Sequence, residues 1–137
     1  MKKKHFAEKN MTRRKSIHIG EFKHANPIPN ACRIGNLLMS GVILGRDPAT
    51  GAMPDRIEDQ CANMFAHMKA IVVAGGGTTD DIIKMTVWLQ DRKQRAPVNV
   101  EWLKMFPDEH SRPARHALQM DMENGALVQC DFTAVIG

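Results

Sequence analysis

The sequence predicts a single α+β domain in which two helices cover one face of a mixed β-sheet. Two segments show the periodicity of amphipathic helices, several shorter ones alternate as strands do, and turn-forming residues separate them. The 137 residues include 43% hydrophobic and 25% charged side chains, which is ordinary for a globular domain. A chain of this length can bury a core without disulfides or metals.

Alternation of apolar and polar residues predicts six strands. Their expected ranges are Ser16–Phe22, Ala31–Ile34, Asn36–Ser40, Ile82–Leu89, Ala114–Met122 and Ala126–Val135. The turn at Gly35-Asn36 joins the second and third strands. Glu123-Asn-Gly125 has the composition of a tight turn and predicts that the last two strands form a hairpin.

The first helix is predicted to begin at Asp55 and to end before the glycines at 75–77. Asp55 and Glu58 have the spacing of a capping box, in which two side chains bond the amides of the first turn. Apolar residues three and four positions apart form one stripe of this helix: Ile57, Cys61, Met64, Met68 and Ile71.

The second helix is predicted from Pro97 to Phe106, because proline suits a first helical turn and Pro107 stops the helix. Its expected buried face holds Val98, Trp102, Met105 and Phe106.

The face of the sheet away from the helices is also expected to carry apolar side chains. Those expected there include Val87, Leu118, Val128 and Phe132. Nothing left in the chain can cover that face, so we expect the protein to oligomerise.

The charge distribution and the cysteines limit which partners and which cellular compartment we expect. Seven cations lie within residues 1–15, which are interpreted as a disordered basic tail, and residues 16–137 are close to neutral. We therefore expect no nucleic-acid partner. Cys32, Cys61 and Cys130 are scattered and are interpreted as small buried apolar residues in a reducing compartment. No segment predicts a signal peptide or a membrane span, so a cytoplasmic location is expected.

Among possible chemical sites, Arg112-Pro-Ala-Arg115 at the start of an apolar strand is the strongest candidate. Phosphate-binding loops, zinc motifs and the nucleophile motif of hydrolases are absent, and the six histidines have no metal-ligand spacing. The planar fork of an arginine matches a carboxylate in two-point contact. A structural ion pair is the alternative interpretation of Arg115.

Five motifs in order resemble the Rid family of reactive intermediate deaminases, also called the YjgF or L-PSP endoribonuclease family. They are Gly35-Asn36-Leu-Leu-Met-Ser40-Gly41, Asp47-Pro-Ala-Thr-Gly51, Val98-Asn99, Arg112-Pro-Ala-Arg115 and Gly125-Ala-Leu-Val. The resemblance runs from about His24 to Val135 and implies a chorismate-mutase-like fold of the bacillus type. Three subunits would pack their sheets into a barrel, with ligand clefts between neighbours. The implied activity is hydrolysis of enamine and imine carboxylates to a 2-keto acid and ammonia, without a metal or organic cofactor.

The resemblance also implies roles for individual residues. Arg115 matches the arginine that binds the substrate carboxylate, and Ser40 and Asn99 match residues that border the cleft. Backbone groups near Ala117 would contact the substrate nitrogen. Gln129 stands where a glutamate is expected to hold the attacking water, and a glutamine positions water but takes up no proton at neutral pH.

Three positions depart from the family pattern. Ile28 replaces a tyrosine, Ala117 replaces a cysteine or threonine, and Gln129 replaces the glutamate, while Asp131 is expected to point away from it. These departures leave three alternatives open: a carboxylate-binding module without turnover, a deaminase of a larger aminomuconate-type acid, and a ribonuclease that uses the basic tail.

Overall fold

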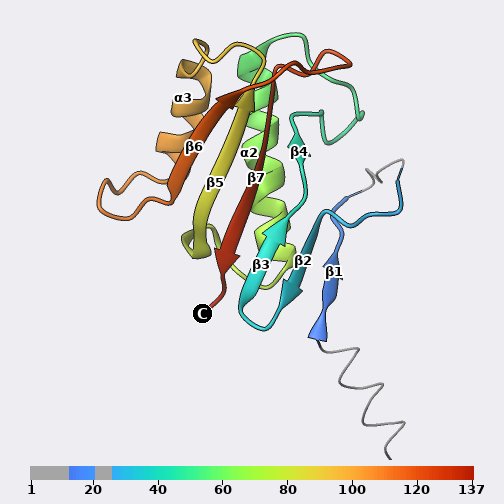
Figure 1. Cartoon of the computed structure of the whole chain (residues 1–137), viewed down its shortest axis with the longest axis vertical. Coiled ribbons are helices and arrows are strands. Elements are labelled where there is room, and N and C mark those ends of the chain that lie inside the picture. The colour runs from blue at the N-terminus through green and yellow to red at the C-terminus, as the bar shows by residue number, and fades with distance from the viewer. Residues whose placement is uncertain (1–12, 21–25) are drawn as a thin grey trace, which may run out of the picture.

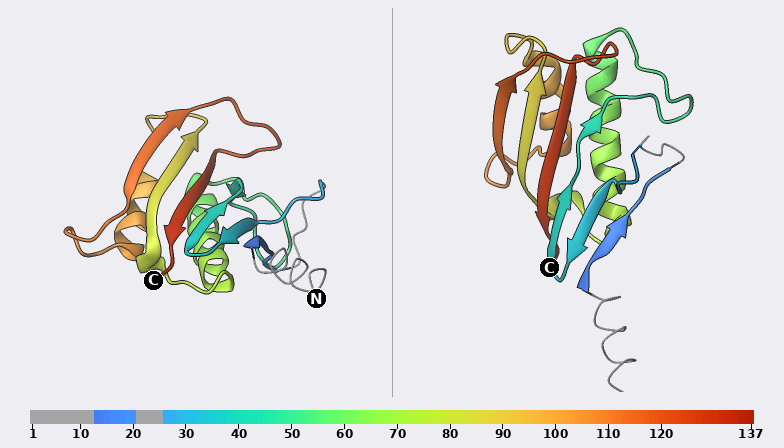
Figure 2. Two further views of the ribbon diagram at one scale, coloured as in Figure 1. Left: turned by 60° about the horizontal axis from the view of Figure 1, so that its bottom comes forward. Right: turned by 45° about the vertical axis from the view of Figure 1, so that its right-hand side comes forward.

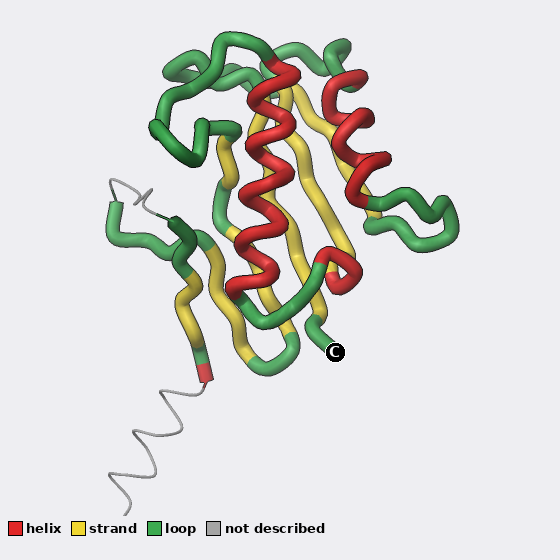
Figure 3. The backbone as a smooth tube through the Cα atoms, turned by 180° about the vertical axis from the view of Figure 1, so that it is seen from behind, coloured by secondary structure: helices red, strands yellow, loops and turns green. Residues whose placement is uncertain are grey.

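The computed structural model describes residues 13–20 and 26–137 and has the predicted α+β architecture. Its strands are β1 (Lys15–Ile17), β2 (Ala31–Ile34), β3 (Leu37–Ser40), β4 (Ile43–Leu44), β5 (Ile82–Leu89), β6 (Ala114–Gln119) and β7 (Val128–Val135). They form one sheet of order β1-β2-β3-β7-β5-β6, and β4 pairs with β7. Both helices lie on the same face of the sheet, while no described element covers the other face (Figure 1, Figure 3).

The strands at both edges of the sheet end earlier than the sequence predicted. At one edge (Figure 2), β1 is shorter than expected, and the predicted end of that strand falls in residues 21–25, outside the described residues. Residues 1–12 of the expected tail also lie outside them, and its last residue, Lys15, opens β1. At the opposite edge, β6 ends at Gln119 because the chain then turns across the end of β5. The two-residue strand β4 was not predicted.

Helices α2 (Ile57–Ala74) and α3 (Ala96–Met105) match the predicted segments to within two residues. The apolar stripe of α2 is buried against the sheet, as expected. The predicted capping box is wrong, because the helix begins at Ile57 with Arg56 as its N-cap, and no side chain caps it. Asp55 therefore lies one residue too early for its carboxylate to serve as the cap.

The predicted hairpin of β6 and β7 is wrong, although its turn forms. Strand β5 lies between the two, parallel to β6 and antiparallel to β7. Asn124 and Gly125 both adopt positive φ, and the amide of Ala126 donates to the carbonyl of Glu123 at 3.1 Å. Turn-forming residues set the local backbone, but the loop around them is long enough to pass over the end of β5. Strand pairing is then decided by packing.

The uncovered face is partly apolar, but not through the residues that the sequence suggested. Val87, Val128 and Phe132 are buried in the core on the helix side, which corrects their expected placement. Leu118 does lie on the uncovered face, because it pairs with Trp88, whose side chain alternates with that of Val87. Large apolar residues that are exposed on this face include Ile34, Leu37, Met39 and Val135.

Gln60 is a fully buried polar residue that ties α2 to the loop before β7. Its Nε2 donates to the carbonyls of Pro54 and Gly125 at 2.7 and 2.9 Å, and its Oε1 accepts from the amide of Leu127 at 2.8 Å. All three of its hydrogen-bonding groups are thus satisfied, as burial requires. None of the helices among the described residues combines the length and the hydropathy that spanning a bilayer requires.

Candidate functional site

Arg115 is the second residue of β6, the strand at one edge of the sheet. It pairs with Met85 of β5, whose side chain is buried beneath the helices, so Arg115 projects to the same side. Its guanidinium therefore reaches α3 and not the uncovered face. Parallel pairing of β5 with β6 puts this arginine beside the helix that connects the two strands.

Two residues of α3 hold the guanidinium. Nη2 of Arg115 donates to Oδ1 of Asn99 at 2.7 Å, and its Cζ lies 4.8 Å from the centre of the Trp102 ring. The indole is braced in turn by Phe106, a buried residue whose ring meets it edge to face at 4.9 Å between centroids. A guanidinium stacked on an indole and bonded at one edge has little rotational freedom, so it is oriented before a ligand arrives.

No described residue accepts from the remaining donors of Arg115. Nη1 is buried and has no hydrogen-bond partner, and no ion pair to this arginine forms among the described residues. Burial lowers the pKa of Arg115, and the nearby charge of Arg95 lowers it further. A buried donor without an acceptor costs roughly 1–3 kcal/mol. A carboxylate oxygen at Nη1 would remove that cost and supply the missing negative charge.

Gln129 does not share the side of the sheet on which Arg115 lies. It pairs with Trp88, which points to the uncovered face, and β5 separates its strand from β6. Asp131 was expected to point away from Gln129, and this prediction is wrong, because residues two apart in a strand share a face. Burial raises the pKa of Asp131, and the charge of Lys84 opposes that shift.

Ser40 has a structural function at the end of β3. Between β3 and β4 the chain carries one residue more than β7 does opposite them, which is a β-bulge. The Ser40 hydroxyl accepts from the amide of Phe132 and donates to the carbonyl of Gly41, both at 2.8 Å. It thereby satisfies backbone groups that the bulge leaves without ladder partners. Two strands separate Ser40 from Arg115 in the same chain.

Of the other predicted site residues, Ala117 lies near Arg115 and Ile28 does not. Ala117 is two positions further along β6, on the same face, and is half-buried. Ile28 is 51% exposed in the segment before β2, four strands away from β6 in the sheet. The structure thus brings together Arg115, Asn99 and Ala117 within one chain.

Sequence reasoning missed two residues at this site. Trp102 was assigned to the core face of its helix, and nothing in the sequence distinguishes a core tryptophan from one that stacks on an arginine. Arg95 lies in a run of polar residues that reads as a loop. The available signal was its spacing of four from Asn99, which puts the two on one side of α3.

The buried cysteines are not thiolates, and the described acidic and histidine residues form no metal-binding cluster. Cys61 and Cys130 are buried, as predicted, while Cys32 is half-buried. Burial raises the pKa of the Cys61 thiol to about 12 and that of Cys130 as well, so neither is a thiolate at neutral pH. No cluster that could hold a metal ion occurs among residues 13–20 and 26–137.

Comparisons with known proteins bear on this arrangement. The family model described as "Endoribonuclease L-PSP" matches residues 19–136. TdcF of Escherichia coli is 35% identical over 96 residues, which cover 69% of this chain and 74% of TdcF. A Salmonella typhimurium protein named 2-iminobutanoate/2-iminopropanoate deaminase is 28% identical over 95 residues, with the same coverages of 69% and 74%. RidA from the Antarctic bacterium Psychrobacter sp. has a crystal structure that matches with a TM-score of 0.81 at 27% identity, over 89% of this chain and 99% of RidA.

Proposed function

Because the chain belongs to the L-PSP endoribonuclease family, also called the Rid or YjgF family, we propose that it hydrolyses small 2-imino acids and their enamine forms. The products are a 2-keto acid and ammonia. The observation that carries this proposal is the buried Nη1 of Arg115, an oriented cationic donor that has no acceptor among the described residues. A substrate carboxylate provides that acceptor.

The proposed cleft lies between two subunits of a homotrimer. Arg115 and Gln129 lie on opposite faces of one sheet, so a ligand on Arg115 meets Gln129 only if a neighbouring copy supplies it. The uncovered face, with its exposed apolar residues, supports such packing. Sheets that meet through this face would form the barrel of a chorismate-mutase-like trimer. Ile28, distant from Arg115 in its own chain, would likewise line the cleft from the neighbour.

In the proposed reaction, docking of the carboxylate on Arg115 fixes the imine carbon against the cleft wall. Backbone groups at Ala117 bond the imine nitrogen. A water held by the carboxamide of Gln129 adds its oxygen to the imine carbon, and one water proton passes to the nitrogen. The carbon–nitrogen bond then breaks, the second proton follows, and ammonia leaves the 2-keto acid. Positioning suffices here because hydrolysis of an imine is intrinsically easy.

A carboxylate-binding module without turnover is the second candidate function, and Gln129 favours it, since a carboxamide takes up no proton at neutral pH. It would use the same Arg115 site. The two functions differ in whether ammonia is released faster than in the uncatalysed reaction. A deaminase of a larger aminomuconate-type acid remains a variant of the first proposal.

The test supplies the imine in situ from an amino-acid oxidase and follows its hydrolysis. Arg115→Ala should abolish acceleration, and Arg115→Lys should restore little, because an ammonium lacks the two-point fork. Arg92→Gln is the matched control for loss of one positive charge. Analytical ultracentrifugation should show the same oligomer for every variant. Retained activity in Arg115→Ala would rule out this mechanism.

A further inference from the structure

A second arginine, Arg95, borders the site and is used by none of the chemistry above. It immediately precedes α3, and the amide of Asn99 donates to its carbonyl at 3.0 Å, so the two residues are one helical turn apart. Residues four apart lie on one side of a helix. Arg95 therefore flanks the carboxamide that holds Arg115. Its Nε donates to the carbonyl of Arg92 at 3.1 Å, which anchors the guanidinium beside the loop.

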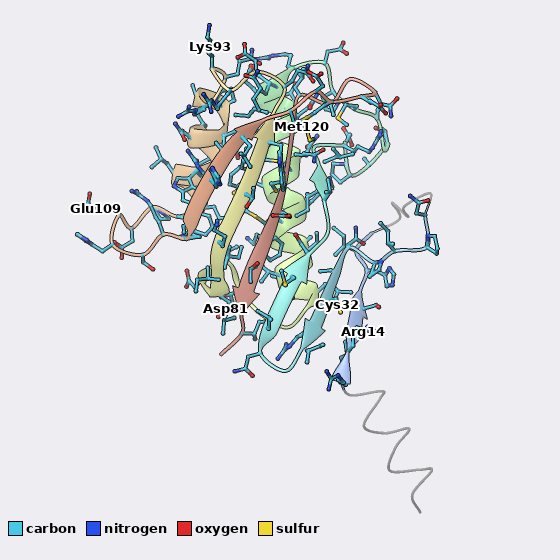
Figure 4. All side chains as sticks on the ribbon, in the orientation of Figure 1. Arg14, Cys32, Asp81, Lys93, Glu109 and Met120 are labelled. Atoms are coloured by element: carbon cyan, nitrogen blue, oxygen red, sulfur yellow. The ribbon has the colours of Figure 1, made fainter. Side chains whose placement is uncertain are left out.

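This end of the site has more positive than negative charge, because its loop carries three cations and one acid, Asp91, whose carboxylate accepts from the amide of Lys93 at 2.9 Å. Arg92 and Lys93 precede Arg95 in the same loop, and Figure 4 shows the Lys93 side chain projecting from the end of the molecule. The ion pairs among the described residues involve none of these cations and not Arg115. The charge of Arg95 adds to the lowering of the Arg115 pKa that burial causes. Two guanidinium groups that form no ion pair with an acid repel each other unless an anion joins them.

One face of strand β6 runs from Arg115 toward the loop that carries Arg95. Arg115, Ala117 and Gln119 share one face of β6, and the side chain between the outer two is a single methyl group. Gln119 Oε1 accepts from the amide of Arg92 at 3.0 Å, which ties the cationic loop to the far end of this strand. A ligand that lies along β6 over Ala117 thus has Arg115 at one end and the Arg95 loop at the other.

We propose that the preferred substrates are dicarboxylic 2-imino acids, with Arg115 bound to the carboxylate next to the imine and Arg95 bound to the distal carboxylate. This inference rests on the proposed function, because it assigns the second end of the same ligand. The positive end of the α3 dipole adds to the attraction. A monocarboxylic imine fills only the Arg115 end and leaves the charge of Arg95 unpaired.

The test compares two five-carbon ligands that differ in one carboxylate. Isothermal titration calorimetry with 2-oxoglutarate and 2-oxopentanoate measures binding without requiring turnover, and the corresponding imines are generated by oxidases from D-glutamate and D-norvaline. The wild-type protein should bind the diacid about tenfold more tightly, the value expected for one charge-assisted contact. Arg95→Gln should reduce the ratio of affinities to about one by weakening only the diacid. Arg92→Gln removes the same charge from the same loop and should keep most of the preference.

Four other outcomes contradict the role of Arg95. Equal affinities in the wild-type protein, an unchanged ratio in Arg95→Gln, or no binding of either acid contradicts it. If Arg95→Gln instead dissociates the oligomer, Arg95 pairs with an acid of a second copy and does not recognise a ligand. A diacid preference without accelerated imine hydrolysis would refute the proposed function and leave the role of Arg95 standing. Accelerated hydrolysis of both imines without a preference for the diacid would support the proposed function and refute the role of Arg95.

Discussion

The carboxamide oxygen of Asn99 accepts a 2.7 Å hydrogen bond from Nη2 of Arg115, and this bond joins α3 to the edge strand β6. Asn99 is thus a partner of the arginine in addition to any contact that it makes with a ligand. An amide accepts this bond without neutralising the guanidinium, so the positive charge stays available for a carboxylate. An acid at the same position would have formed a closed ion pair.

This relationship predicts that Asn99→Asp impairs ligand binding more than Asn99→Ala does. The new carboxylate would pair with Arg115 and compete with the substrate, which should raise KM about tenfold. Asn99→Ala removes only the orienting bond and should raise KM by a smaller factor. Steady-state kinetics on the imine substrate, or titration with a 2-keto acid, would measure both. Equal effects of the two variants would show that Asn99 does not control the charge of the site.

Trp102 is predicted to position Arg115 through its ring face. Trp102→Leu should raise KM about threefold, since an exposed cation–π contact contributes roughly 0.5–1 kcal/mol. Trp102→Phe keeps an aromatic face and should restore most of the affinity, with kcat little changed in both variants. The melting temperatures of the two variants provide the control for packing. If leucine and phenylalanine have the same effect on KM, the stacking contact contributes nothing to binding.

Gln129 is predicted to hold the attacking water without accepting its proton. Gln129→Glu introduces a base, so kcat at neutral pH should rise about a hundredfold, the low end of the range for general-base catalysis. The gain should appear as pH rises through the pKa of the new carboxyl group, because only the ionised form accepts a proton. The wild-type protein should show no such limb in its profile of kcat against pH. Identical profiles would place the water elsewhere.

Gln60 is predicted to be the most important buried polar side chain for stability. Gln60→Leu leaves the carbonyls of Pro54 and Gly125 and the amide of Leu127 without this partner, and should cost about 3 kcal/mol of unfolding free energy. Gln90→Leu is a matched control, because Gln90 Oε1 accepts one bond, from the amide of Met122 at 2.6 Å. Urea unfolding at one fixed protein concentration would measure the unfolding free energy of both variants. A smaller loss in Gln60→Leu than in Gln90→Leu would contradict the prediction.

Local patterns predicted the helices and most strands closely. The limits of β5 agree with the prediction, and the stripe of α2 is buried, because both follow from backbone periodicity. The predicted pairing of β6 with β7 is wrong. A turn at Asn124 and Gly125 fixes only local dihedral angles, and packing of the core decides which strands become neighbours. Val87 was placed on the wrong face for a similar reason. An alternating pattern separates the residues of a strand into two faces but does not say which face the helices cover.

At the candidate site the sequence indicated Arg115 and Asn99, and the structure joins them. It did not indicate Trp102 or Arg95, because a stacking tryptophan and a core tryptophan occupy the same helical positions. Ser40 shows the opposite case: its hydroxyl satisfies backbone groups at a bulge, which no sequence pattern had shown. Contacts between residues distant in the chain depend on register, and register is a property of the assembled sheet.

Residue type and local spacing were enough to predict the fold class, the helical and most strand segments, and the arginine most suited to a carboxylate. The folded chain was needed to show that Arg115 faces α3 with one buried donor that no described residue satisfies, and that Gln129 faces the other side. It was also needed to show that Arg95 lies one helical turn from Asn99. A side chain's face and partners are set when strands pair and helices pack. These steps bring together residues that no local pattern connects.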